Sequence, residues 1–206
     1  MYEIGSGKAG LITFLARQGF DCKATEVTRE RGEKHSDGNT PNLSWGVSDG
    51  VHLERFERAD GYDVVISDQV IEHLHPEDVG AHLSGARQIL RPGGRYIFST
   101  PHRFSGPHDV SRVFKCDKPI GMHLKEYTYR ELVAAVRTAG YKRTYFAFFP
   151  ADGTAGVILG RLYLWVLLAT EYVLGWIPSH RLRRVCAKAF RKLGLFSDGV
   201  SLIAEK

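Results

Sequence analysis

A glycine-rich segment near the start of the chain restricts the possible folds more than any other feature. Glu3-Ile4-Gly5-Ser6-Gly7-Lys8-Ala9-Gly10 follows a short apolar run, and Glu26 ends the next apolar run. Glycines at such a turn let backbone N–H groups approach a ligand closely. An acid about 20 residues further on can accept hydrogen bonds from ribose hydroxyls. The segment therefore predicts a strand–turn–helix unit that binds a nucleotide-type cofactor.

Glu3 indicates which kind of cofactor is bound. The glycine pattern alone does not separate a dinucleotide from S-adenosylmethionine. Glu3 lies two residues before the first glycine, and a carboxylate there suits a cationic amino-acid group better than a pyrophosphate. We therefore expect S-adenosylmethionine. A nicotinamide-dependent oxidoreductase is the alternative, because its fingerprint also combines glycines with a later acid.

Further segments follow in the order that such a site requires. Asp49 follows a third apolar run, residues 63–74 read as a buried strand running into a loop, and residues 89–98 read as a helix end, a tight turn and a strand. Together they resemble the class I S-adenosylmethionine-dependent methyltransferases, over residues 1–150 and the last strand. The oxidoreductase alternative explains neither of the last two segments, and the chain has no second nucleotide-binding half.

Apolar runs and helical patterns alternate along the chain, which predicts a doubly wound α/β fold. The resemblance implies a mostly parallel, Rossmann-like seven-stranded sheet whose last strand is antiparallel. We expect a single domain, residues 1–206, with helices at 76–90 and 129–139. Two long excursions, residues 101–127 and a helical insertion at 151–198, exceed plain connections. The expected strands lie near residues 1–4, 21–27, 43–48, 62–67, 94–100, 142–149 and 199–205.

Composition sets the expected compartment and partners. The three cysteines are odd in number and lack C-x-x-C spacing, so neither a disulfide framework nor a zinc site is predicted. A cytoplasmic location is expected. The net charge of +5 comes mostly from residues 181–192. The chain opens inside its expected first strand, without a signal peptide or the helix that usually covers the cofactor in the resembled family, so we expect low cofactor affinity.

The resemblance assigns roles to the residues around the cofactor. Glu3 is expected to face the amino group of the methionine moiety, while residues 5–7 pass beneath it. Glu26 is expected to accept hydrogen bonds from both ribose hydroxyls, and Asp49 from the adenine amine. The loop after the fourth strand closes the site. The predicted cofactor-binding residues are Glu3, Gly5, Ser6, Gly7, Gly10, Glu26, Val27, Ser48, Asp49, Gly50, Ser67, Gln69 and Val70.

A methyltransferase needs little acid–base chemistry, because the sulfonium supplies the reactivity and the protein aligns the nucleophile. His73 is the candidate base if the acceptor is a hydroxyl, since a histidine titrates near neutrality. The alternative is that His73 hydrogen-bonds backbone at a helix start. His75 with His73 is not expected to form a metal site, as nothing at ligand spacing completes it.

Residues 101–127 lie where class I enzymes build the acceptor pocket. Four side chains on this loop are predicted to bind the acceptor: His102, His108, His123 and Tyr127. The loop resembles that of bacterial methyltransferases associated with sugar and cell-envelope biosynthesis, which implies a small-molecule, sugar or lipid-linked acceptor. The alternative is a solvated loop whose histidines pair with nearby carboxylates.

The insertion has two unusual halves. The apolar run of residues 162–169 is too short for a membrane span, which needs about 20 residues, so a buried or interfacial helix is expected. Basic and apolar residues then alternate over residues 181–193, a pattern suited to an anionic membrane surface. This predicts peripheral association with the inner face of the membrane. A substrate lid or dimer face is the alternative. Nucleic acid is not expected, because the basic residues are interleaved with aliphatic partners rather than with exposed aromatic stacking groups.

Two questions stay open at the level of sequence. A non-catalytic S-adenosylmethionine-binding protein would use the same cofactor residues as an enzyme. The atom that receives the methyl group, oxygen, nitrogen or carbon, depends on an acceptor that the loop does not identify.

Overall fold

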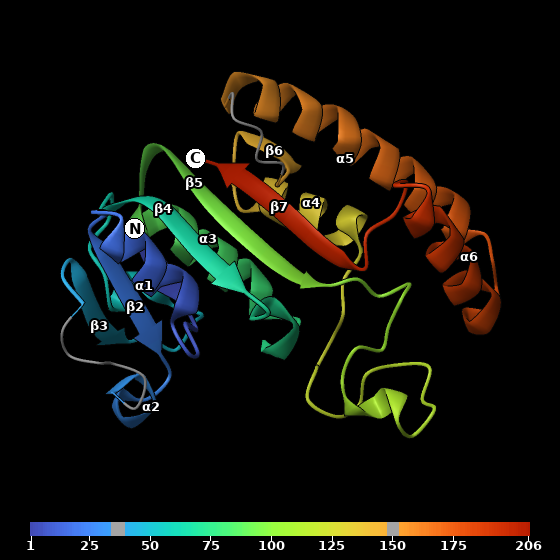
Figure 1. The fold of residues 1–206 in the computed structure, drawn as a ribbon, viewed down its shortest axis with the longest axis horizontal. Helices are drawn as coiled ribbons and strands as arrows, with labels where there is room; N and C mark the ends of the chain where they lie inside the picture. Colours follow the sequence, from blue (N-terminus) through green and yellow to red (C-terminus); the bar gives the residue numbers. More distant parts are fainter. Residues whose placement is uncertain (34–39, 148–152) are drawn as a thin grey trace.

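Strands and helices alternate along the chain (Figure 1). The computed structural model describes residues 1–33, 40–147 and 153–206. Its strands are β1 Tyr2–Ile4, β2 Cys22–Glu26, β3 Leu43–Val47, β4 Tyr62–Asp68, β5 Leu90–Pro101, β6 Arg143–Phe146 and β7 Gly199–Glu205. Its α-helices are α1 Gly10–Arg17, α2 Arg29–Glu33, α3 Val79–Ile89, α4 Tyr129–Thr138, α5 Gly153–Gly175 and α6 His180–Lys192. Three short 3₁₀ helices are η1 Leu53–Arg55, η2 Ile71–His73 and η3 Val110–Arg112.

The described strands form one seven-stranded sheet in the order β3-β2-β1-β4-β5-β7-β6. Neighbouring strands are parallel except where β7 pairs with β5 and β6. The predicted doubly wound fold with an antiparallel last strand is therefore confirmed. The order changes direction between β1 and β4, and the carboxyl ends of these two strands flank the crevice where such sheets bind ligands.

Most predicted boundaries agree with the structure to within one residue, as for β1 to β4, β7 and α4. Helix α3 begins three residues later than predicted. Pro76 lies in a separate turn, closed by the Asp78 N–H donating to the His75 carbonyl at 2.9 Å, before the helix starts. Strand β5 begins earlier, because Leu90 already pairs with Tyr62 before the glycine turn. Residues 148–149 of the predicted sixth strand lie outside the described residues.

The sheet carries a hydrophobic core on each face. Alternate residues of a strand point to opposite faces, so Tyr2 and Ile4 enter the main core, which α3 and α4 cover. A smaller core lies between α1 and β2, where Ile12 and Ala16 pack near Ala24. Glu3 points away from the main core. The strand alternation therefore places the predicted cofactor carboxylate beside the glycine turn and α1.

A buried polar chain links α3 to the strands of the site. His82 Nδ1 lies 2.5 Å from the Gly50 carbonyl oxygen, and His82 Nε2 lies 2.6 Å from the Tyr96 hydroxyl. The Tyr96 hydroxyl is also 2.6 Å from Ser67 Oγ. A carbonyl only accepts, so His82 donates from Nδ1 and accepts from Tyr96, which in turn accepts from Ser67. Burial lowers the pKa of His82 to about 4, which keeps the ring neutral.

The insertion forms α5 and α6, which pack along one edge of the domain (Figure 1). Buried Leu164, Leu167 and Leu174 fix one face of α5. Residues Val157–Gly175 are long and apolar enough to cross a membrane by length and composition alone, with a third of that stretch buried. The run of residues 162–169 is thus part of a longer apolar helix, and a buried or interfacial position for it stays a prediction. Glu171, which interrupts the apolar sequence of this helix, is buried in the protein.

We predict that Tyr96→Phe destabilises the protein by about 1–3 kcal/mol, because it leaves His82 Nε2 and the Ser67 hydroxyl buried without partners. Tyr145→Phe is the matched control, since the Tyr145 hydroxyl is buried without a hydrogen-bond partner, and its loss should leave stability unchanged or slightly higher. Urea unfolding of both variants measures the difference. Equal destabilisation would contradict a role for the Tyr96 hydrogen bonds.

Candidate functional site

The glycine turn after β1 adopts backbone conformations that favour glycine. Gly5 and Gly7 have φ angles of +64° and +53°. A side chain at Gly5 would meet Val70 at 3.0 Å. Ser6 anchors the turn to β2: its N–H donates to the Thr25 carbonyl at 2.9 Å, and its hydroxyl accepts from the Thr25 N–H at 3.1 Å. The turn is therefore fixed with its backbone close to the crevice.

Glu3 supplies a buried negative charge next to this turn. The side chain is only 6% exposed, and its Oε2 atom has no hydrogen-bond partner in the part of the chain that the structure describes. Burial raises the pKa of Glu3 to about 7, with smaller contributions from the nearby acids Asp68 and Glu26. A buried carboxylate without a partner is costly. An ammonium group placed here would satisfy the oxygen and stabilise the charged form.

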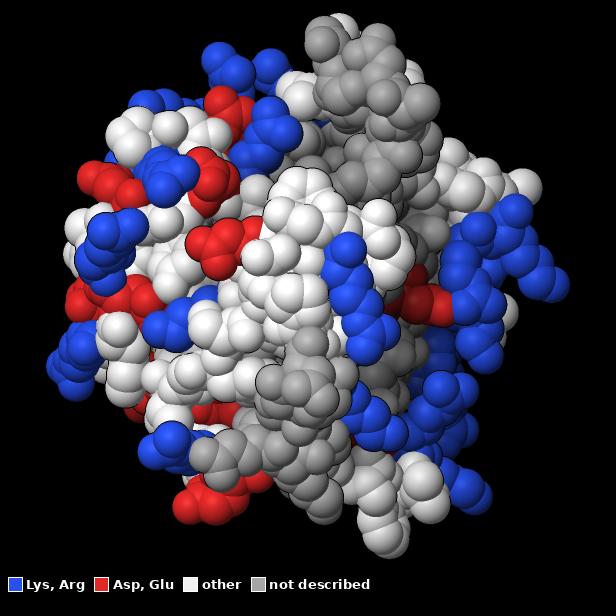
Figure 2. All heavy atoms as spheres, turned by 60° about the vertical axis from the view of Figure 1, so that its left-hand side comes forward, with Lys and Arg blue, Asp and Glu red and all other residues white. Residues whose placement is uncertain are grey.

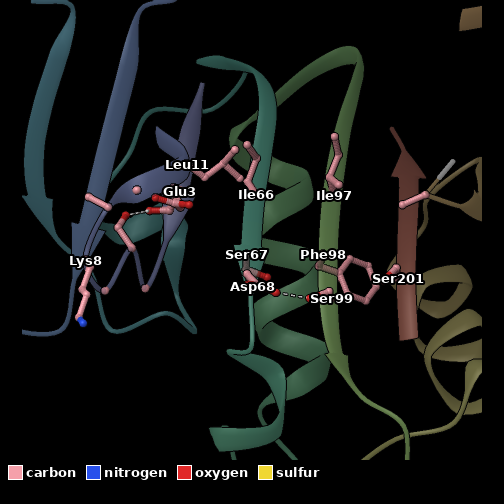
Figure 3. Close-up of a pocket in the computed structure, with 16 residues that line it drawn as sticks. Glu3, Lys8, Leu11, Ile66, Ser67, Asp68, Ile97, Phe98, Ser99 and Ser201 are labelled. Carbon is pink, nitrogen blue, oxygen red and sulfur yellow. Dashed lines mark hydrogen bonds between the residues drawn. The ribbon is translucent and has the colours of Figure 1, made fainter. Parts of the chain in front are cut away.

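A cavity of about 570 Å³ opens from this turn across the ends of β4, β5 and β7 (Figure 3). Its size suits a nucleoside-containing ligand. Six predicted cofactor residues line it: Glu3, Gly5, Ser6, Gly7, Gly10 and Ser67. Other lining residues, which sequence reasoning missed, include Lys8, Asp68, Phe98, Ser99 and Ser201. Asp68 accepts a hydrogen bond from Ser99 across neighbouring strands. Asp68 and Ser99 each directly follow a buried strand residue, Ser67 and Phe98. A polar residue at such a position is the sequence signal that could have identified them.

The other predicted cofactor residues surround the cavity without lining it. Glu26 Oε1 accepts from the Gly7 N–H at 2.7 Å, and Oε2 accepts from the Val27 N–H at 3.3 Å. Oε2 also lies 3.4 Å from the Arg31 Nε atom, whereas Oε1 keeps a second lone pair that a ribose hydroxyl can use. Asp49 Oδ1 instead accepts two backbone N–H groups of the following turn, both at 2.8 Å. Asp49 therefore shapes the turn, and its adenine contact stays a prediction.

Three further residues predicted to bind the cofactor help to fix the backbone of the loops after β3 and β4. Ser48 Oγ accepts from the Gly50 N–H at 3.1 Å, and Gly50 has a φ angle of +72°. Gln69, with a φ angle of +55°, donates its N–H to the Ser99 carbonyl at 3.0 Å. These bonds fix the two loops that flank the cavity.

Carboxylates organise the acceptor loop, residues 101–127. Glu126 Oε1 accepts from the His108 N–H at 2.6 Å and lies 3.0 Å from His123 Nδ1. Burial opposes ionisation of Glu126, but the hydrogen bonds from the two histidines outweigh it and lower its pKa. Asp109 accepts the N–H groups of residues 121–123 with one oxygen, at 2.9–3.3 Å. The alternative interpretation, that the loop histidines pair with carboxylates, describes this geometry.

Two residues predicted to bind the acceptor belong to the interior of the fold instead. His102 is 0% exposed; its Nε2 lies 2.6 Å from Glu171 Oε1, and its Nδ1 accepts from the Phe104 N–H at 3.0 Å. Tyr127 is buried in the main core. The prediction for His102 and Tyr127 is corrected accordingly, because partners on other elements hold both side chains away from the surface. His108 and His123 keep partial exposure, and for them an acceptor contact stays a prediction.

His73, the candidate base, lies in η2 at the edge of the crevice and is exposed. Its Nδ1 lies 3.0 Å from the Met122 carbonyl oxygen, so it bonds acceptor-loop backbone rather than a helix start. Its ring packs edge-on against His123 with centroids 5.1 Å apart. The structure thus brings the base candidate to one of the predicted acceptor residues.

We predict that affinity for S-adenosylhomocysteine, which keeps the same amino-acid group, rises with pH up to about 7. The free carboxylate of Glu3 has its pKa raised to about 7, and an ammonium partner lowers that pKa, so binding below pH 7 releases a proton. Affinity should change by close to tenfold per pH unit below pH 7 and level off above it.

Calorimetry between pH 5.5 and 8 measures this dependence. The Glu3→Gln variant should bind weakly at every pH and lose the dependence. A flat profile for the unaltered protein, with equal affinity in Glu3→Gln, would exclude Glu3 as the partner of the amino group.

Comparisons with known proteins agree with this geometry. A family model described as "Methyltransferase domain" matches residues 2–145. A probable S-adenosylmethionine-dependent methyltransferase of Mycolicibacterium smegmatis is 37% identical over 101 residues, which cover 48% of this chain and 32% of that protein. A ubiquinone biosynthesis O-methyltransferase of Paramagnetospirillum magneticum is 30% identical over 106 residues, 50% of this chain and 41% of that protein. The matches thus span less than half of each curated relative.

Solved structures show the same fold. An S-adenosylmethionine-dependent methyltransferase of Archaeoglobus fulgidus aligns over 100% of this chain and 85% of its own, with a TM-score of 0.61 and 16% identity. Phosphoethanolamine N-methyltransferase 2 of Haemonchus contortus, in complex with S-adenosyl-L-methionine, aligns over 100% of this chain and 48% of its own, with a TM-score of 0.60 and 15% identity. With the family match over residues 2–145, the chain belongs to the methyltransferase-domain family and has the fold of the class I S-adenosylmethionine-dependent methyltransferases.

Proposed function

We propose that this protein transfers the methyl group of S-adenosylmethionine to a lipid-linked acceptor at an anionic membrane surface. One observation carries the choice of acceptor. Helices α5 and α6, which adjoin the acceptor loop, expose a continuous apolar face bordered by basic side chains. The choice of S-adenosylmethionine as the methyl donor rests on the buried Glu3, the glycine turn and Glu26.

The transfer itself requires alignment more than acid–base catalysis. The cofactor's sulfonium supplies the reactivity. Holding the acceptor in line with it contributes about 7–11 kcal/mol of barrier lowering, whereas a general base adds about 3–5 kcal/mol. Asp49 and Gln69 fix the loops after β3 and β4, and Asp109 fixes the acceptor loop. Loops held in this way suit the role, because they keep the ligand geometry without motion of the backbone.

The outer face of α5 has the composition of a helix in contact with lipid. Residues on that face recur at helical spacing and are large, apolar and exposed: Trp165 is 71% exposed and Trp176 is 74% exposed. Arg161 is the charged residue on this face. Continuous apolar patches of this kind mark interaction surfaces. The exposed apolar side chains are Ile158, Leu159, Leu162, Trp165, Val166, Tyr172, Val173 and Trp176.

Helix α6 adds the charge that an anionic surface attracts. Exposed Leu182, Val185 and Leu193 continue the apolar face. Arg181, Lys188 and Lys192 border it on the exposed side of the helix. Figure 2 shows Lys and Arg side chains gathered along one edge of the face that it presents, whereas both signs alternate along the opposite edge. A basic helix with an apolar stripe suits anionic head groups over acyl chains.

This surface adjoins the acceptor loop. Phe104, near the start of the loop, packs in one cluster with Leu174 of α5, Ala187 of α6 and Phe196. The Arg183 guanidinium lies 4.7 Å from the centre of the Phe104 ring. An acceptor anchored in the bilayer beside α5 and α6 would therefore reach the loop without leaving the surface.

The packing of α5 favours a position along the membrane surface over a span. Leu164, Leu167 and Leu174 are buried against the domain, and Glu171 holds the helix to α4 with hydrogen bonds of 2.5 and 3.0 Å. Inserting the helix would expose this carboxylate to lipid, which costs several kcal/mol. A helix that keeps these contacts can bury only its outer face.

We predict salt-sensitive binding to vesicles that contain anionic lipid and weaker binding to neutral vesicles. Each basic residue near an anionic surface contributes about 1 kcal/mol, so Lys188→Glu with Lys192→Glu should weaken sedimentation with vesicles by tenfold or more. Trp165→Ser should weaken it at all salt concentrations. Phe20→Ser, an exposed aromatic residue that follows α1, is the matched control and should bind normally.

Equal and negligible binding to both vesicle types would contradict the membrane proposal. A stable dimer in solution that Trp165→Ser dissociates, without vesicle binding, would instead assign this face to a second copy of the chain.

We also predict that labelled methyl groups from S-adenosylmethionine enter the organic phase of a total lipid extract, with stoichiometric release of S-adenosylhomocysteine. Label confined to water-soluble products would contradict a lipid-linked acceptor, but methyltransferase activity would still be supported. Cofactor binding without turnover in either pool would identify a non-catalytic S-adenosylmethionine-binding protein.

A further inference from the structure

Hydrogen bonds tie the acceptor loop to η2, and they bring together three side chains of types that bind metals. The Glu72 carbonyl oxygen accepts the N–H groups of Leu124 and Lys125 at 2.8 and 3.3 Å. The preceding residue, His123, is thereby held beside Glu72 and His73. One donor atom from each of these three side chains lies within 4.8 Å of the other two.

One carboxylate oxygen of Glu72 is unsatisfied within the described part of the chain. The Glu72 side chain is 0% exposed, and Oε2 accepts from the Thr100 hydroxyl at 2.8 Å. Oε1 has no hydrogen-bond partner among the described residues. A buried carboxylate oxygen without a partner is destabilising. An oxygen held in this way can bind a cation as a ligand.

The two histidines each leave one ring nitrogen available. His73 Nδ1 lies 3.0 Å from the Met122 carbonyl oxygen, which only accepts, so Nδ1 carries the hydrogen. His123 Nδ1 lies 3.0 Å from Glu126 Oε1, a carboxylate oxygen, and donates to it. With the hydrogen on Nδ1, each ring has a lone pair on Nε2. Histidines that bind metals are oriented in this way, with the second nitrogen donating to a carbonyl or carboxylate.

From these contacts we propose that Glu72, His73 and His123 bind a divalent transition-metal ion with the ligand preference of zinc. Two imidazoles and one carboxylate form a common three-ligand set for Zn²⁺. Donors bound to one zinc ion at about 2.0–2.2 Å lie about 3.5 Å apart, so the cluster closes on the ion by adjustment of the exposed His73 ring. Three protein ligands leave the fourth position of a tetrahedral zinc ion for water or an acceptor.

The open position gives the site a chemical role at the acceptor loop. A hydroxyl coordinated there loses its proton more readily, because the cation stabilises the alkoxide. His73 then acts as a ligand rather than as a general base. Sequence reasoning considered His73 with His75 and found no third ligand; the third ligand is on the acceptor loop, and only the fold brings it near.

Cobalt(II) titration of the untagged, chelator-treated protein tests the site, since Co²⁺ in a site of this kind gives visible d–d absorption and Zn²⁺ competes for it. We expect one Co²⁺ per chain, displaced by Zn²⁺. His73→Ala and His123→Gln should each weaken Co²⁺ binding at least tenfold. His75→Ala is the matched control, because His75 is exposed and lies 3.4 Å from Glu77, and it should bind Co²⁺ as the unaltered protein does.

Affinity for S-adenosylhomocysteine, measured on the same samples without metal, reports whether each variant is folded. This measurement also separates the metal site from the methyl-transfer proposal, because it requires neither an acceptor nor turnover. The absence of saturable Co²⁺ binding in the unaltered protein would overturn the proposal. So would undiminished binding in both folded His73→Ala and His123→Gln, or an equal loss in His75→Ala.

Discussion

The buried carboxylate of Glu171 connects the parts of the molecule that surround the acceptor loop. It accepts the Tyr129 and Arg130 N–H groups at the start of α4, and it pairs with His102 at the start of the loop. A negative charge is favourable at a helix N-terminus, where N–H groups lack partners. One side chain therefore fixes α5 against α4 and sets where the acceptor loop leaves β5. The position of the exposed apolar face follows from this attachment.

A second set of carboxylates determines what the loop histidines can do. Burial opposes ionisation of Asp109, but hydrogen bonds from Ser111 and from loop backbone outweigh it and lower its pKa to about 2. The loop therefore keeps its shape across the physiological pH range. Glu126 pairs with His108 and His123 within this shape. Both histidines are consequently oriented groups. His108 uses both ring nitrogens, with Glu126 and Ser105, whereas within the described residues His123 has a hydrogen-bond partner at Nδ1 and none at Nε2.

Local patterns in the sequence predicted the sheet and the cofactor turn because their causes are local. The glycines at 5 and 7 occupy left-handed conformations, and the Thr128–Glu131 capping box starts α4 as its sequence indicates. Contacts between distant residues were not predictable in this way. His82 lies on the buried face of α3, beside Leu83 and Ala86. Its partners Gly50 and Tyr96 belong to other elements, so nothing in the sequence near His82 indicates them.

The sequence of the insertion likewise does not show where the charge of Glu171 lies in the fold. In the sequence, Glu171 interrupts an apolar helix and argues against contact with lipid, because a charge on a lipid-facing surface is costly. In the fold, the Glu171 side chain lies on the buried face, where three hydrogen-bond donors surround it. The outer face is left with Trp165, Trp176 and their apolar neighbours. A charge within an apolar helix therefore indicates which side faces the protein, and the opposite side, once identified, is more apolar than the average over the helix.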